Sequence, residues 1–224
     1  MTDQHCGMRI GTDGVLLGAW ARTDSEVRRV ADIGTGCGVV ALMIAQRAAE
    51  AIIDAIEIDS GACDDAAFNF RNSPWSDRLN LHCCDFGNFN PLPGYDMIVS
   101  NPPFFTETLQ SPDAARASAR HAGSLSFGSL ARCCAHILSE RGRLSVILPS
   151  GDDDKTLMQA SLAKIYPRRI CHVLPRAEAR PIRTLWEFSL TDGNCECSSL
   201  PLREDRGAYS RQYVALTKDY HLHL

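Results

Sequence analysis

The 224-residue chain lacks any apolar run long enough to cross a lipid bilayer. Its opening residues, MTDQHCGMRIG, have neither the charged n-region nor the apolar h-region of a secretory signal peptide. No C-x-x-C motif occurs among its ten cysteines, and no cysteine pair stands at zinc-finger spacing from a histidine. The sequence therefore predicts a cytoplasmic protein with free thiols, no metal site and no membrane contact.

Lysine is also scarce, since 20 of the 23 basic residues are arginines. Arginine suits phosphate forks and base stacking. Up to residue 112 the chain has 7 basic and 15 acidic residues, and from there on it has 16 and 12. We therefore expect an anionic partner to contact the C-terminal half, although the net charge of -4 argues against a general nucleic-acid binder.

Short apolar runs alternate with helix-like stretches, without an internal repeat or an interdomain linker. This pattern predicts one α/β domain with a mostly parallel sheet. Residues 140–142 are interpreted as a turn and residues 191–199 as a polar, hairpin-like insertion. The expected strands are 29–33, 52–57, 79–86, 97–99, 143–149, 169–174 and 182–190.

A glycine-rich loop, Gly34-Thr35-Gly36-Cys37-Gly38, lies between the first strand and the helix at 39–49, directly after Asp32. Such a loop brings backbone N–H groups and a helix N-terminus toward a ligand. Its spacing is G-x-G-x-G and not the G-x-G-x-x-G of dinucleotide binders. Glu57 ends the next strand about twenty residues later, the offset of an acid that holds ribose hydroxyls. The combination predicts a nucleoside-containing ligand, and the alternative is a chance glycine turn.

The third strand also ends in an acid, Asp85, followed by Phe86. The carboxylate is placed to accept a hydrogen bond from an adenine amino group, and the Phe86 backbone N–H to reach the ring. The alternative interpretation is an Asx turn that opens the following loop.

The fourth strand stops at Asn101-Pro102-Pro103-Phe104, because two successive prolines have no N–H to continue a ladder. The Asn101 carboxamide oxygen and the Pro102 carbonyl can accept the two hydrogens of one NH2 group, and Phe104 offers a face on which a base can stack. The alternative is a proline-rich loop with a packed aromatic side chain.

Two further segments have both structural and functional interpretations. In the glycine-rich opening, Thr12 or Asp13 is expected to cap a helix that begins near Gly14, or the glycines allow close approach to a ligand. In the second half, arginines form either solvated charge or a phosphate-contacting patch, and we favour the patch. They are Arg168, Arg169, Arg176, Arg180 and Arg183, joined by Arg116 and Arg120 from a long polar segment.

The chain resembles class I S-adenosylmethionine-dependent methyltransferases in motifs that follow the family's order: Asp32–Gly38, Glu57–Asp59, Asp85–Phe86 and Asn101–Phe104. That family implies a Rossmann-like α/β fold whose seven-stranded, mostly parallel sheet has helices on both faces. The N-P-P-F motif resembles the branch that methylates adenine N6, guanine N2, cytosine N4 or glutamine amide nitrogens.

More specific phrases lie outside these motifs, at 11–21, 41–47, 72–75 and 209–217. They are similar to the bacterial tRNA1(Val) adenine-37 N6-methyltransferases, although Phe104 stands where those enzymes usually have tyrosine. The resemblance implies that residues 1–224 form one methyltransferase domain, monomeric, with 1–28 as a loop and helix over the cofactor site.

The resemblance also implies site residues. S-adenosylmethionine would contact the glycine loop at Gly34, Gly36 and Gly38. Glu57 would hold the ribose, Asp85 and Phe86 the adenine, and Asp32 and Thr12 the methionine end. A tRNA would be the substrate, with Asn101, Pro102, Pro103 and Phe104 as the catalytic clamp. Alternatives are a guanine-N2 rRNA or glutamine-N5 protein methyltransferase and, outside catalysis, an RNA-binding scaffold.

Overall fold

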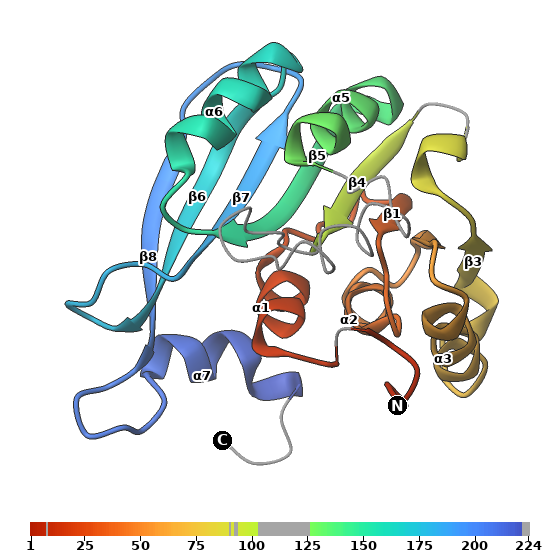
Figure 1. The fold of residues 1–224 in the computed structure, drawn as a ribbon, viewed down its shortest axis with the longest axis horizontal. Coiled ribbons are helices and arrows are strands. Elements are labelled where there is room, and N and C mark those ends of the chain that lie inside the picture. The colour runs from red at the N-terminus through yellow and green to blue at the C-terminus, as the bar shows by residue number, and fades with distance from the viewer. Residues whose placement is uncertain (8, 90, 92–93, 103–125, 221–224) are drawn as a thin grey trace, which may run out of the picture.

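The computed structural model describes residues 1–7, 9–89, 91, 94–102 and 126–220. Within these residues, eight strands form one sheet in the order β3-β2-β1-β4-β5-β7-β6-β8 (Figure 1). The strands are β1 (Arg29–Ile33), β2 (Ile52–Glu57), β3 (Leu79–Cys83), β4 (Tyr95–Ser100), β5 (Leu138–Pro149), β6 (Tyr166–Arg176), β7 (Arg183–Ser189) and β8 (Glu196–Arg203). The helices are α1 (Thr12–Trp20), α2 (Val39–Arg47), α3 (Ser60–Arg71), α5 (Phe127–Ile137), α6 (Asp153–Leu162) and α7 (Arg211–Thr217).

Helices cover both faces of the sheet, so its central strands β1 and β4 are buried over most of their length. Side chains alternate along each strand, so Val30 and Val99 lie in one core and their neighbours Ala31 and Ile98 in the other. The first core is closed by α1, α2, α3 and α7, the second by α5 and α6 (Figure 1). Strands β3, β2, β1, β4 and β5 are parallel, and β7 runs antiparallel to β5 and β6.

The expected α/β architecture with a mostly parallel sheet is confirmed, but the expected count of seven strands is wrong. The eighth strand is β8, which pairs in parallel with β6 at the edge of the sheet. Part of it lies in the stretch interpreted as an insertion. Its residues 196–199 are all exposed and only Leu200 is buried, so the strand lacks the alternation that marks a half-buried strand.

The turn expected at 140–142 is not found in the structure either. These residues lie within the long strand β5, which shifts register against β4: Tyr95 pairs with Leu138 and Met97 with Arg143. The extra residues on β5 form an irregularity of the bulge type. A Gly-containing polar triplet is typical of a turn and of a bulge alike, so the sequence does not separate the two.

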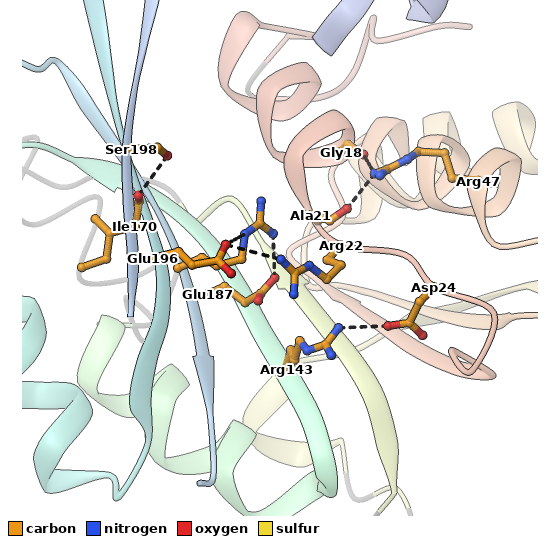
Figure 2. Close-up of polar contacts among 11 residues, drawn as sticks. Gly18, Ala21, Arg22, Asp24, Arg47, Arg143, Ile170, Glu187, Glu196 and Ser198 are labelled. Carbon is orange, nitrogen blue, oxygen red and sulfur yellow. Dashed lines mark hydrogen bonds and ion pairs between the residues drawn. The ribbon is translucent and has the colours of Figure 1, made fainter. Parts of the chain in front are cut away.

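Several arginines have structural roles. Arg47 on α2 donates from Nη1 to the carbonyls of Gly18 and Ala21, at 2.7 and 2.8 Å, and so closes the C-terminus of α1 (Figure 2). Arg78 does the same for α2, with three hydrogen bonds to the carbonyls of Ala45, Ala48 and Ala51. A cation at this end of a helix satisfies orphan carbonyls and complements the macrodipole.

In the described part of the chain, no helix has both the length and the apolar composition that a bilayer crossing requires.

Candidate functional site

Four of the sequence-predicted segments meet at one edge of the sheet. Because β3, β2, β1 and β4 are adjacent and parallel, their carboxyl ends lie side by side. Asp85, Glu57, Gly34 and Asn101 therefore follow one another along this edge. In open α/β sheets such an edge is where ligands bind.

The glycine loop has a backbone that other residues would adopt only with strain. Gly34, Gly36 and Gly38 have φ values of 70°, 57° and 86°. A Cβ atom on Gly38 would collide with the Phe70 ring of α3, whereas one on Gly34 would project into open space. The first glycine thus leaves room for a ligand, and the third lets α3 pack closely against the loop.

Asp32 fixes the conformation of this loop through hydrogen bonds. Its side chain is only 1% exposed, and its Oδ2 accepts hydrogen bonds from Thr35 Oγ1 at 2.6 Å and from the Ala41 amide at 3.0 Å. Burial raises the pKa of Asp32 to about 7, against the lowering effect of these two hydrogen bonds. The carboxyl group is therefore poised to change charge near neutral pH. Sequence reasoning missed Thr35, which lies between two of the glycines.

Glu57 also supports the loop. Its Oε2 accepts from the Gly36 amide at 2.8 Å, and its Oε1 accepts from the amides of Ile58 and Asp59 at 2.9 Å each. A carboxylate offers about four acceptor positions, so about one, on Oε2, is left for a ribose hydroxyl. The predicted ribose contact remains a prediction.

Asp85 and Phe86 follow β3 at the outer end of this edge. Asp85 Oδ1 accepts from the Gly87 amide at 2.8 Å, which is the Asx-type turn of the alternative interpretation. The residue is exposed and Phe86 is buried. The turn orients the carboxylate and leaves its second oxygen for another donor, so the adenine contact remains a prediction.

A cavity of about 290 Å³ lies between the glycine loop, the start of α1 and Asn101. Asn101 follows β4, and its Oδ1 is buried without a hydrogen-bond partner among the described residues. Buried acceptors almost always have partners, so this atom requires a donor from outside the described chain. Pro102 is buried beside it. Pro103 and Phe104 lie outside the described residues.

The start of α1 differs from the expected helix start at Gly14. The helix begins at Thr12, and Gly11 is its N-cap, without a side-chain cap. Asp13 instead accepts a hydrogen bond from Arg183 Nε at 2.7 Å. Thr12 lines the cavity as its predicted role requires, and so does Arg9, which sequence reasoning missed. In the sequence, the only indication of this role is that Arg9 is a cationic residue two positions before Gly11.

The predicted arginine patch is divided between the two ends of β6, which runs from Tyr166 to Arg176. Arg183 pairs with Pro149 at the carboxyl end of β5, and Arg176 and Arg180 are exposed nearby, without an ion pair to any described residue. Arg168 and Arg169 lie near the amino end of β6. There, Arg169 bonds buried Glu187 at 3.0 Å and stacks over Trp20 at 4.1 Å.

Other charges in that region are paired as well. Arg22 contacts Glu196 at 3.5 Å and Arg143 contacts Asp24 at 3.1 Å (Figure 2). Arg169 therefore serves the fold. Arg9 is the exposed arginine that lines the cavity, whereas Arg176 and Arg180 are exposed at the carboxyl end of β6 and in the segment that follows it. Arg116 and Arg120 lie outside the described residues.

Residues 10–166 match the model of the "Methyltransferase small domain" family. Curated relatives named tRNA1(Val) (adenine(37)-N6)-methyltransferase include one from Bacteroides fragilis, 42% identical over 97% of this chain and 92% of that protein. Others come from Flavobacterium psychrophilum, at 41% over 96% and 93%, and Aeromonas salmonicida, at 39% over 97% and 92%.

Solved structures show the same fold at low identity. A predicted O-methyltransferase from Agrobacterium tumefaciens has a TM-score of 0.73 at 18% identity, over 92% of this chain and 96% of that one. The glycopeptide N-methyltransferase MtfA, complexed with S-adenosyl-L-methionine, has a TM-score of 0.60 at 11% identity, over 80% and 95%. The solved structures show the shared fold, and the family model and the curated relatives identify the chain as a member of the methyltransferase small domain family and, within it, of the tRNA1(Val) (adenine(37)-N6)-methyltransferases.

Proposed function

We propose that this protein transfers a methyl group from S-adenosylmethionine to N6 of adenine 37 in tRNA1(Val). The names of the relatives support the substrate. The observation in the structure that carries the proposal is the buried Oδ1 of Asn101 beside the cavity, for which the described residues provide no hydrogen-bond partner. An amino group on a flat base is the kind of donor that such an oxygen lacks.

The residues around the cavity fit S-adenosylmethionine. Gly34 leaves space that a side chain would fill, and Asp32 offers a buried carboxyl beside the loop. The methionine end would lie near Thr12, where the first N–H groups of α1 and the Arg9 guanidinium can receive its carboxylate. Glu57 would hold the ribose, and Asp85 and Phe86 the adenine.

Catalysis then depends on positioning. The bound cofactor supplies a methyl group that is already electrophilic, because it is attached to a sulfonium. Asn101 Oδ1 and the Pro102 carbonyl accept the two amino hydrogens of the target base, which turns the nitrogen lone pair toward the cavity. Holding the two reactants in line supplies much of the rate acceleration. The amine sheds its proton after transfer, so we assign no general base.

The target base must leave its stack to reach the clamp. A base in a single-stranded anticodon loop is less costly to unstack than one in a duplex. Phe104 would stack on it. The exposed Arg176 and Arg180 would contact the flanking phosphates, since Arg176 ends β6 and Arg180 follows it, at the same end of the sheet as the carboxyl end of β5.

The clamp is tested by Asn101→Ala, with the exposed Asn194→Ala as a matched control. Removing one preorganised contact of this kind lowers turnover by roughly 100-fold or more. We expect that loss in Asn101→Ala, with cofactor Kd within about threefold of wild type because Asn101 makes its bonds to the base. Asn194→Ala should behave as wild type. Near-normal turnover of Asn101→Ala on tRNA would refute the clamp.

A further inference from the structure

The first residues of the chain lie against the cofactor cavity. We call residues 2–7 and 9–14 the N-terminal strap. Its first half runs along α3, and its second half, from Arg9 to Gly14, lines the cavity. Near the end of the first half, Cys6 lies over the glycine loop: a Cβ atom on Gly36 would be 3.2 Å from Cys6 Sγ.

Asp65 on α3 holds the first half of the strap. This side chain is 2% exposed, and its Oδ2 accepts from the amides of His5 and Cys6 at 2.8 and 3.1 Å. Its Oδ1 lies 3.1 Å from His5 Nδ1. Although burial acts to raise the pKa of Asp65, these contacts lower it below its ordinary value, so the group is a carboxylate near neutral pH. Its hydrogen bonds to the strap are therefore charge-assisted.

Asn69 stands one helical turn further along α3 and is 4% exposed. Its Oδ1 accepts from the Thr2 amide at 2.7 Å, and its Nδ2 donates to the carbonyls of Thr2 and Cys37, at 2.8 Å each. Since Cys37 belongs to the glycine loop, this one amide joins α3, the strap and the loop. Neither Asp65 nor Asn69 lines the cavity described above.

We infer that Asp65 and Asn69 are positioning residues that fasten the strap over the glycine loop, so that its second half forms the outer wall of the cofactor cavity. The inference rests on the proposed function, because it takes that cavity as the cofactor site. A strap that is docked only part of the time lowers the apparent affinity for the cofactor by the docked fraction. Asp65 thereby controls cofactor binding without touching the cofactor.

The test compares Asp65→Ala and the isosteric Asp65→Asn with Asp64→Ala, an exposed carboxylate on the same helix. Strap release is measured as the rate of tryptic cleavage after exposed Arg9, relative to cleavage after exposed Arg206. Cofactor Kd is measured by calorimetry, and kcat at saturating cofactor.

We expect faster cleavage after Arg9 in Asp65→Ala and a Kd about tenfold weaker, as for a docked fraction that falls to a tenth. Added cofactor should slow cleavage after Arg9 in the wild type. The kcat should stay within about twofold, because the clamp is unchanged. Asp65→Asn keeps one acceptor, so its cleavage rate after Arg9 and its cofactor Kd should fall between those of wild type and Asp65→Ala. Asp64→Ala should match wild type.

Unchanged cleavage after Arg9 in Asp65→Ala would show that Asp65 does not hold the strap. Faster cleavage with an unchanged Kd would show that the strap does not wall the cofactor cavity. Either result overturns this inference alone. If the wild type fails to bind S-adenosylmethionine, the proposed function and this inference both fail.

Discussion

Replacing Asp32 by asparagine should stabilise the protein without its cofactor. The asparagine oxygen can still accept from Thr35 and Ala41, while the cost of burying a charge disappears. Burial raises the pKa of Asp32 from 3.8 to about 7 in the folded protein. A group whose pKa is raised by folding binds protons more tightly in the folded state, so its contribution to stability is lost as pH rises from about 4 to about 7.

The size of the effect follows from that difference in pKa. At pH 8 the ionised carboxylate costs the folded state about 4 kcal/mol relative to a neutral side chain, and at pH 4.5 about 1 kcal/mol. Urea unfolding of both proteins at these two pH values should therefore show that Asp32→Asn is more stable than wild type by about 4 kcal/mol at pH 8 and by only about 1 kcal/mol at pH 4.5. A variant that is less stable than wild type by the same amount at both values would refute the reasoning.

The same carboxyl group should make cofactor binding depend on pH. A cationic ligand favours the ionised form, so wild-type affinity should fall about 15-fold between pH 7 and pH 5.5. In Asp32→Asn the affinity should be lower and nearly flat over this range. Calorimetric titration at several pH values measures both slopes, and parallel slopes would remove Asp32 from the account of the methionine end.

Three further results are expected. Glu57→Ala should weaken S-adenosylmethionine binding in calorimetry; equal affinity would remove the ribose assignment, and a preference for NAD would overturn the cofactor. Arg176→Glu with Arg180→Glu should weaken tRNA binding and reduce its salt slope by about 1 to 2, with cofactor Kd unchanged; Arg141→Glu, at the opposite end of the sheet, is the control, and an equal loss there would indicate a nonspecific effect. Arg78→Ala should lower the free energy of unfolding by about 1–3 kcal/mol in urea, because three carbonyls at and just beyond the end of α2 lose a charged donor; no change would mean that water replaces it.

The centre of the fold could be predicted from the sequence because its signals are local. A buried strand followed by glycines, as at Asp32–Gly38, or by two prolines, as after Asn101, shows both the element and its end. The parallel order then places their carboxyl ends together. Strand β8 escaped prediction since an exposed edge strand has no hydrophobic alternation.

Contacts between distant residues could not be predicted in this way. Asp13 meets Arg183 across 170 residues, and Asp65 meets His5 across 60. In the sequence, Asp65 is one acid among many, and only the packing of α3 shows that it is buried. The arginine-rich span was predicted as one patch, yet Arg169 and Arg176 lie toward opposite ends of the same strand, β6.

The central claim is methylation of one amino group in one nucleotide. The direct measurement is incubation of a tRNA1(Val) transcript with isotopically labelled S-adenosylmethionine, followed by nuclease digestion and mass spectrometry. We predict labelled N6-methyladenosine in the fragment that contains position 37, and none when adenine 37 is replaced. With Asn101→Ala, the initial rate of labelling should be lower by roughly 100-fold or more. N2-methylguanosine, label at another position, or label found only in rRNA or protein would contradict the account.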